Sequence, residues 1–163
     1  MIADGLEIET PADEPVIRFR RFVNAPPALV FTAWTDPAAL VHWWGPAQWT
    51  LIVCEVDLRV GGGYRFVHQT PEGHRHGSSG DYLEIDPGRR LVNTFVFDGT
   101  PDRKSVDSTD FLTAPGGTLV FGISRHESIT ARDDHVNGGM ERGMRDTYQR
   151  LDEWIEALPD KEP

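Results

Sequence analysis

Alternating apolar and polar positions predict a series of β-strands over the first three quarters of the chain. In residues 50–60 the even positions are mostly apolar, while polar side chains gather toward the end of the odd positions. Shorter runs of strand character occupy residues 16–22, 64–69, 75–85, 90–98, 105–113 and 117–127, and Pro and Gly residues separate most of them. Strands with turns at such close spacing predict a meandering antiparallel sheet.

A different period begins near residue 133. Apolar side chains then recur every three or four residues, which predicts one face of an amphipathic helix over about residues 133–158. These positions are Val136, Met140, Met144, Tyr148, Leu151, Ile155 and Leu158. At ~1.5 Å per residue such a helix can lie across a whole sheet. Two shorter helices are expected at about 26–34 and after Asp36, because Pro and Asp are common at helix starts.

Strands closed by one long helix predict an α+β domain. A sheet of about six or seven strands curls under its own twist and leaves a concave face for the helix. The two short helices, which follow the first strand, are expected to close one end. Residues 1–14 are acidic and lack periodicity, so we expect a flexible tail there and a single domain over 15–160.

Small and flexible residues on the long helix favour a cavity beneath it. Gly138, Gly139 and Gly143 fill no space in its first turns, and the side chains of Met140 and Met144 adapt to irregular shapes. The strand faces opposite carry aromatic side chains. We therefore expect a pocket between helix and sheet, although close packing of helix backbone on the sheet explains the glycines equally well.

Charge and composition narrow the classes of partner. The formal net charge of −10 disfavours nucleic acid, which is bound by displacing counterions with Lys and Arg, and it also disfavours anionic membranes. The sequence has no apolar run of ~18 residues and no signal peptide at its N-terminus. Cys54 is the only cysteine, so an oxidising compartment is not implied. These features lead us to expect a cytoplasmic protein.

Candidate ligand contacts are the large or polar side chains expected to face this pocket. They are Trp34, Trp43, Phe66, His68, Asn93, Phe95, Phe121, Met140, Met144 and Tyr148. His68 shares a strand face with Phe66, so it is the one catalytic candidate, an imidazole that orients a ligand or exchanges a proton with it. A histidine at the sheet margin, hydrogen-bonded to a neighbour or to water, is the interpretation we favour. For Trp34 and Phe121 the competing role is core packing.

Other chemistry finds little support in the sequence. His68, His74 and His76 flank one hairpin but lack the four-ligand spacing of a structural zinc site, so no metal is expected. The sequence contains neither the GxSxG nucleophile motif nor the GxGxxG dinucleotide motif, and no cofactor is expected. Asp107 and Asp110 are too loosely placed to indicate a catalytic carboxylate pair.

Four segments, taken in order, resemble one protein family. They are 26–46, which contains His42-Trp43-Trp44-Gly45-Pro46; 55–62, which reads Glu55-Val56-Asp57-Leu58-Arg59-Val60-Gly61-Gly62; 80–91, which begins Gly80-Asp81-Tyr82-Leu83-Glu84-Ile85; and 127–151, which contains Gly139-Met140-Glu141-Arg142-Gly143-Met144. The chain is similar over 15–158 to homologues of the heat-shock-protein-90 ATPase activator, within the SRPBCC or START-like superfamily. The resemblance implies the helix-grip fold and a deep cavity.

Three functions remain open at this stage. The resemblance implies binding, since members of the superfamily bind lipids, hormones and polyketides. We therefore favour a module that holds a small hydrophobic molecule, such as a lipid, polyketide or aromatic metabolite. One alternative is an enzyme of the cyclase or hydrolase type acting on such a ligand, and His68 is the residue that suggests it. The other is a co-chaperone-like interaction domain, which rests on the family name alone. Homodimerisation through a sheet edge or helix face is left open.

Overall fold

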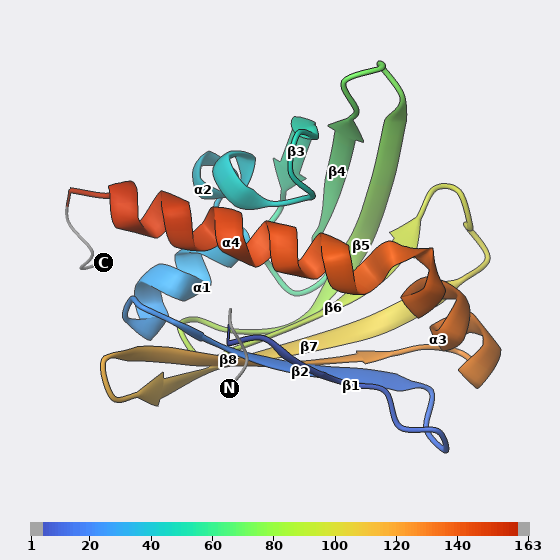
Figure 1. The fold of residues 1–163 in the computed structure, drawn as a ribbon, viewed down its shortest axis with the longest axis horizontal. Helices are drawn as coiled ribbons and strands as arrows, with labels where there is room; N and C mark the ends of the chain where they lie inside the picture. Colours follow the sequence, from blue (N-terminus) through green and yellow to red (C-terminus); the bar gives the residue numbers. More distant parts are fainter. Residues whose placement is uncertain (1–4, 160–163) are drawn as a thin grey trace.

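The computed structural model describes residues 5–159 and shows one antiparallel sheet wrapped around a long helix (Figure 1). Within this range eight strands follow the spatial order β1-β2-β8-β7-β6-β5-β4-β3, so the second strand lies beside the last. The strands are β1 (Glu7–Glu9), β2 (Val16–Val23), β3 (Thr50–Val56), β4 (Gly63–Gln69), β5 (Arg75–Asp86), β6 (Arg90–Phe97), β7 (Lys104–Ala114) and β8 (Gly117–Arg125). The predicted antiparallel sheet is confirmed.

The helices cover the concave face of this sheet. They are α1 (Pro27–Thr35), α2 (Pro37–Trp43), α3 (Ile129–His135), the π-helical turn η1 (Val136–Met140) and α4 (Glu141–Ala157). The carboxylate of Asp36 accepts a hydrogen bond of 3.0 Å from the backbone N–H of Ala38 and so caps α2. Because α4 crosses the sheet while α1 and α2 close one end, the predicted helix-grip fold is confirmed (Figure 1).

The C-terminal helical region is longer and less regular than its period predicts. It begins at α3, where the hydroxyl of Ser128 accepts a hydrogen bond of 3.0 Å from the N–H of Ala131. It changes direction at Gly139, whose φ of 92° lies outside the helical range. Glycine adopts a positive φ at little cost, which explains why the break falls there. The expected single helix is therefore two helices joined by η1.

A short edge strand lies within the segment that we expected to be a tail. Strand β1 pairs with β2 in antiparallel register, with Glu7 opposite Arg20 and Glu9 opposite Arg18. Each of these opposite pairs forms an ion pair. Leu6, which precedes the strand, is fully buried. Three residues are too few to show a period in the sequence, so tertiary pairing determines this strand.

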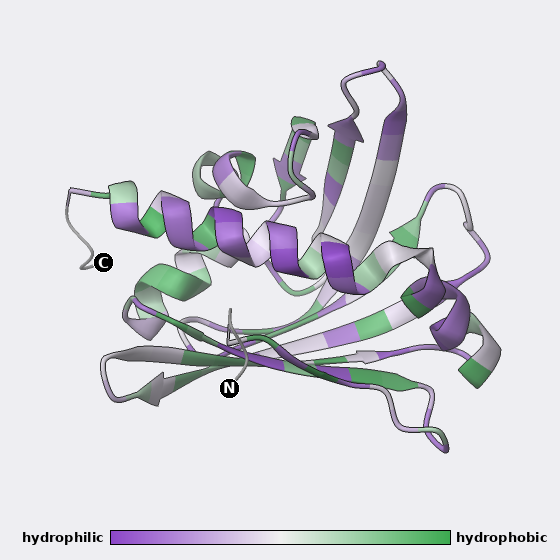
Figure 2. Cartoon of the chain, viewed as in Figure 1, coloured by the Kyte–Doolittle hydropathy of each residue, from purple (hydrophilic) through white to green (hydrophobic). Residues whose placement is uncertain are grey.

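The apolar core lies between the sheet and the helices that cover it (Figure 2). Trp43 of α2 is fully buried, and its indole N–H donates a hydrogen bond of 3.0 Å to the carbonyl of Ala33. Trp34 of α1 lies between Phe111 and Tyr148, at centroid distances of 5.5 and 5.8 Å. These contacts fix α1, α2 and α4 over one end of the sheet. Within residues 5–159, no helix combines the length and apolar character needed to cross a membrane.

Candidate functional site

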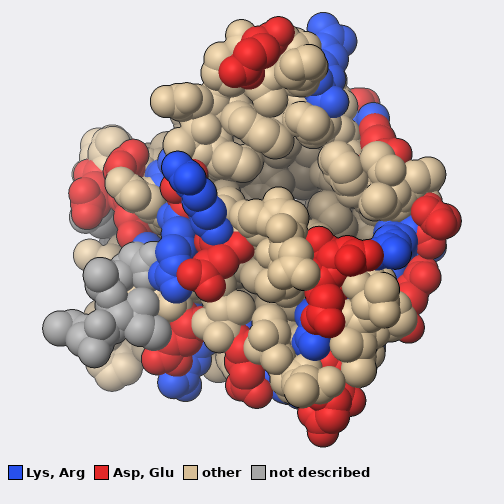
Figure 3. Space-filling view, turned by 45° about the vertical axis from the view of Figure 1, so that its right-hand side comes forward, with Lys and Arg blue, Asp and Glu red and all other residues tan. Residues whose placement is uncertain are grey.

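A hollow of about 230 Å³, here called the inner cavity, separates the middle of the sheet from η1 and α4. Its described lining comes from six strands, four helices, η1 and the residue that follows α2: Ile17, Phe19, Trp34, Leu40, Trp44, Tyr64, Phe66, Ser78, Tyr82, Leu91, Asn93, Phe95, Ser105, Asp107, Ser108, Thr109, Ile123, Ser124, His135, Met140, Met144 and Tyr148. Figure 3 shows a hollowed face whose deepest atoms belong to neither basic nor acidic residues. The walls are mainly aromatic and aliphatic, which is typical of sites for small organic ligands.

A row of polar residues crosses the sheet in the lining of this cavity. The register places Asn93 of β6 opposite Asp107 of β7, and Asp107 opposite Ser124 of β8. Opposite residues on neighbouring strands lie on the same face of a sheet, which brings the three side chains together. The row therefore supplies hydrogen-bonding groups inside an otherwise apolar space.

Asp107 is the acidic residue of this row. The hydroxyls of Ser124 and Ser105 both donate to its oxygen Oδ1, at 2.7 and 3.3 Å. Burial raises the pKa of Asp107 from 3.8 to about 6, because the interior disfavours the charged carboxylate, and the two hydroxyls offset part of that effect. At neutral pH the side chain is thus mainly a carboxylate.

Tyr64 and Phe66 together form one wall of the cavity. Their rings are stacked, with 4.8 Å between the ring centroids. The Tyr64 hydroxyl reaches across β5 and donates a hydrogen bond of 2.6 Å to the carbonyl of Thr94 on β6. Asn93 donates to the same hydroxyl at 3.3 Å. Gly80 of β5 lies beneath this contact, where a Cβ atom would be 1.9 Å from the Thr94 carbonyl oxygen. A glycine is therefore required at position 80.

Tyr148 of α4 forms the opposite wall. Its ring lies 5.7 Å from that of Phe19, and the Arg21 guanidinium lies 5.6 Å from its centroid. Burial raises its pKa above the ordinary value of a tyrosine, so the phenol stays neutral. Within residues 5–159 its hydroxyl has no hydrogen-bond partner, yet protein atoms do not seal it off. This hydroxyl is available to a ligand.

A second hollow of about 400 Å³, here called the outer cavity, adjoins the inner one. It lies between the loop that joins β6 to β7 and the helical segment α3–η1. Its lining is Phe95, Phe97, Thr100, Arg103, Lys104, Ser105, His126, Ala131, Asp134, His135, Gly138, Gly139 and Met140. Phe95, Ser105, His135 and Met140 belong to both linings. The two cavities therefore share part of their walls.

Two histidines stand where the cavities meet. The rings of His126 and His135 lie 5.2 Å apart, and Nε2 of His126 is 3.2 Å from Oγ of Ser124. Because the Ser124 hydroxyl donates to Asp107, His126 is the donor in its contact with Ser124. Burial lowers the pKa of both imidazoles, that of His126 to about 4, so both are uncharged at neutral pH.

The structure gathers most of the predicted contact residues around the inner cavity. Seven of them line it: Trp34, Phe66, Asn93, Phe95, Met140, Met144 and Tyr148. Trp43 packs in the core instead. Phe121 alternates along β8 with the buried Val120 and Gly122, so it lies on the other face of that strand.

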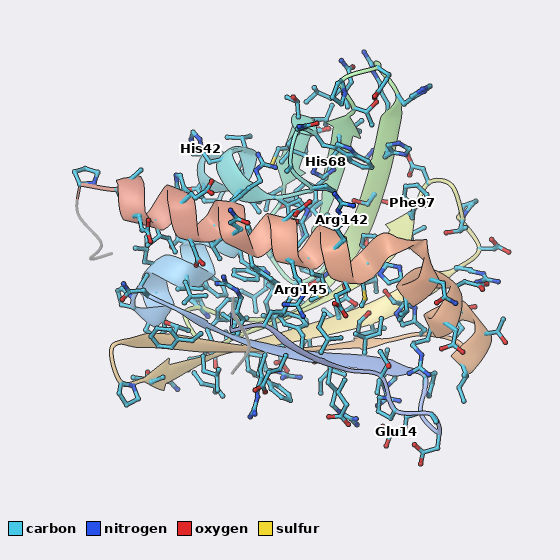
Figure 4. The ribbon with its side chains drawn as sticks, viewed as in Figure 1. Glu14, His42, His68, Phe97, Arg142 and Arg145 are labelled. Carbon is cyan, nitrogen blue, oxygen red and sulfur yellow. The ribbon has the colours of Figure 1, made fainter. Side chains whose placement is uncertain are left out.

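His68 lies apart from the inner cavity. It is on β4, whereas Phe97 is at the end of β6 (Figure 4) and lines the outer cavity. The ring N–H at Nε2 of His68 donates a hydrogen bond of 3.0 Å to the carbonyl of Trp44. Burial lowers its pKa, which keeps the ring neutral. His68 therefore joins the segment after α2 to the sheet and does not contact the space where a ligand would lie.

Apart from Asn93, sequence reasoning missed the polar residues of the lining, above all Asp107 and Ser124. A signal was present, because Asp107 lies on the same face of β7 as Ser105, Thr109 and Phe111, all of which are buried. Alternation thus places a carboxylate on the inner face. What the sequence did not supply was the register that sets Ser124 beside it. Among residues 5–159 no group of three or more side chains is arranged to hold a metal ion.

Comparison with known proteins gives a consistent result. Residues 24–156 match the family described as "Activator of Hsp90 ATPase homolog 1-like protein". A comparison with curated proteins gives no significant match. A crystal structure of a protein from Rhodobacter sphaeroides is 28% identical, with a TM-score of 0.87 over 94% of this chain and 99% of that one.

Two further solved structures extend this comparison. A protein from Nitrosomonas europaea is also 28% identical, with a TM-score of 0.80 over 90% of this chain and 97% of that chain. An AHSA1-like protein from Aeromonas hydrophila is 22% identical, with a TM-score of 0.68 over 87% and 92% of the two chains. At that identity the similarity speaks for the fold alone.

Proposed function

Because the chain belongs to the family of proteins similar to activator of Hsp90 ATPase homolog 1, which has the helix-grip fold, we propose that it binds a small hydrophobic molecule in the inner cavity. The observation that carries this proposal is the hollow of about 230 Å³ between α4 and the sheet. A solid core would leave no such space, since protein interiors are normally packed without voids larger than a water molecule.

The volume of the hollow limits the size of the ligand. An apolar cavity of about 150 Å³ holds benzene, so the inner cavity has room for roughly nine non-hydrogen atoms. A longer molecule would extend past Phe95 and Met140 into the outer cavity. A compact ligand that buries about 200 Å² of apolar surface gains roughly 5 kcal/mol from that burial before the costs of association. Binding of such small probes is therefore expected in the micromolar to millimolar range.

The proposal is tested by filling the cavity. Met144 lines it from α4, so Met144→Trp places an indole where the ligand would lie. Gln149→Trp is the matched control, because Gln149 is on the exposed side of the same helix. Aromatic and aliphatic compounds of about nine non-hydrogen atoms are expected to raise the melting temperature of the wild type and of the control, but not of Met144→Trp.

Intrinsic fluorescence gives an independent readout. Trp34 and Trp44 both line the inner cavity, so a bound ligand changes the environment of their indoles. Saturable fluorescence changes at the concentrations that raise the melting temperature support the proposal. It is contradicted if no compound of the panel, at millimolar concentration, alters either property of the wild-type protein.

A further inference from the structure

Among the described residues 5–159, the lining of the inner cavity holds one carboxylate and no basic side chain to balance it. In that range it contains neither Lys nor Arg, and Asp107 is its sole acidic residue. His135 lines the cavity and His126 bonds to Ser124, but burial keeps both imidazoles neutral at pH 7. The nearby Arg21 is already engaged in a two-point contact with Asp152. A buried charge without an opposite charge beside it is unfavourable, so a cation in this cavity would be stabilised by Asp107.

The hydrogen bonds of Asp107 leave one side of the carboxylate open. Ser124 and Ser105 both donate to Oδ1. Within residues 5–159, Oδ2 accepts no hydrogen bond, and it is not among the polar atoms sealed off by protein. A carboxylate oxygen has room for two donors, and a ligand in the cavity can supply them.

Aromatic rings surround the same place. Tyr64 on β4, Asp107 on β7 and Tyr148 on α4 all line this cavity. Burial raises the pKa of both phenols, and the negative charge of Asp107 raises it further, so both rings stay neutral beside the carboxylate. A cation held by Asp107 would thus also lie near aromatic rings, whose faces attract positive charge.

We propose that the inner cavity selects ligands in which an apolar body carries a protonated amine, with the ammonium group bonded to Oδ2 of Asp107. This inference rests on the proposed function and adds the chemical class of the ligand. Trp34, Phe66 and Met144 would contact the apolar body. The chain's excess of negative charge also favours the approach of a cation.

Three probes of nearly equal size separate this inference from simple apolar binding. They are 2-phenylethylamine, its neutral analogue 2-phenylethanol, and phenylacetate. Each is titrated calorimetrically at pH 8 into the wild type, Asp107→Asn and Asp110→Asn. Asp110 is the matched control, because it lies on the same strand but outside the cavity lining, in an ion pair with Arg90.

The wild type and Asp110→Asn are expected to bind the amine at least tenfold more tightly than the alcohol and to bind phenylacetate more weakly than either. In Asp107→Asn the preference for the amine should fall below threefold while the affinity for the alcohol is retained. Equal binding of amine and alcohol by the wild type overturns the inference but leaves the proposed function standing. The inference also fails if the preference survives in Asp107→Asn. If none of the probes binds to the wild type, both proposals fail.

A pH series on the wild type keeps the test independent of how well the variant folds. The titratable groups facing Asp107 are Tyr64, His126, His135 and Tyr148; burial raises the pKa of both phenols and lowers the pKa of both imidazoles, so all four are uncharged at pH 8. Protonation of Asp107 at lower pH should weaken amine binding by about tenfold between pH 8 and 5, and alcohol binding by less than twofold. The inference is contradicted if the affinities for the amine and the alcohol fall equally, or if neither affinity falls.

Discussion

The guanidinium of Arg21 lies 5.6 Å from the ring centroid of Tyr148, and it also donates two hydrogen bonds, of 2.8 and 2.5 Å, to the carboxylate of Asp152. Arg21 is on β2, whereas both partners are on α4. The three side chains therefore join the final helix to the sheet beside the inner cavity. Because Tyr148 lines that cavity, the position of its wall depends on this ionic contact.

Removal of the Asp152 charge should destabilise the fold. The Arg21 side chain is only 4% exposed and that of Asp152 is 39% exposed, so Asp152→Asn leaves a buried cation without its partner. We expect the free energy of unfolding to fall by about 2 kcal/mol, less than for a fully buried pair, because water screens Asp152. Urea denaturation measures this. The neighbouring exposed change Glu153→Gln should have an effect of less than about 0.5 kcal/mol, and equal effects would contradict the argument.

Gly80→Ala should disrupt the wall formed by Tyr64. The added Cβ atom would lie 1.9 Å from the Thr94 carbonyl oxygen and 2.7 Å from the Tyr64 hydroxyl, so strands must shift and the Tyr64–Thr94 hydrogen bond must break. We expect a loss of about 2–4 kcal/mol in the free energy of unfolding. Tyr64→Phe removes the hydrogen bond without the clash and should cost less, about 1–2 kcal/mol. If the alanine variant is as stable as the wild type, the contact is not as described.

The two glycines of η1 should respond in opposite directions to the same substitution. Neither would bring a Cβ atom within 4 Å of another group, but only Gly139 has a positive φ, of 92°. Gly138→Ala should stabilise the protein by about 0.5–1 kcal/mol, since alanine loses less backbone freedom on folding. Gly139→Ala should destabilise it by about 1 kcal/mol through left-handed strain. Thermal or urea unfolding of the two variants tests this. The argument is refuted if both substitutions stabilise the protein or both destabilise it.

The free energy of unfolding should depend on pH through the titration of Asp107. The pKa of this carboxyl is about 6 in the fold and 3.8 in a model peptide, so the folded chain retains a proton that the unfolded chain has released. Its contribution to stability is therefore lost as pH rises from about 4 to 6, by an amount on the order of 3 kcal/mol.

Comparison with Asp107→Asn isolates that contribution. The buried histidines titrate in the opposite sense, because their lowered pKa values make acid unfavourable to the fold, but they are present in both proteins and cancel. The stability of the wild type relative to Asp107→Asn should consequently decline between pH 4 and 7. A constant difference over this range would show that the pKa of Asp107 is ordinary.

The fold was largely predictable because strands and helices can be recognised from the spacing of apolar residues along the chain. Strand and helix repeats, Pro and Asp at helix starts, and glycines at turns all act locally, so the α+β class and the order of elements follow from the sequence. Strand β3 shows the limit of this reasoning. A bulge between Leu51 and Val53 shifts the alternation, so that Leu51 is buried before it while Cys54 and Val56 pack against the core after it.

The candidate site was predictable in its apolar part and at Asn93, but not in the rest of its polar lining. Large side chains such as Trp34 and Tyr148 face inward because burial of apolar surface is favourable wherever it occurs. The cluster of Asn93, Asp107 and Ser124 depends on how three strands align, and short-range patterns do not specify that alignment. His68 shares the alternation of Phe66, yet the segment after α2 covers it. The polar chemistry of the cavity thus became visible only in three dimensions.

The guanidinium of Arg103 and the carboxylate of Asp134 meet at 2.6 Å, joining the loop before β7 to α3 across the lining of the outer cavity. Both side chains are exposed, so dissolved salt weakens their attraction. A ligand that enters or leaves through the outer cavity must pass this ion pair, and it passes more readily while the two side chains are apart. Added salt should therefore quicken the arrival and the departure of a neutral guest together, and leave its equilibrium occupancy unchanged.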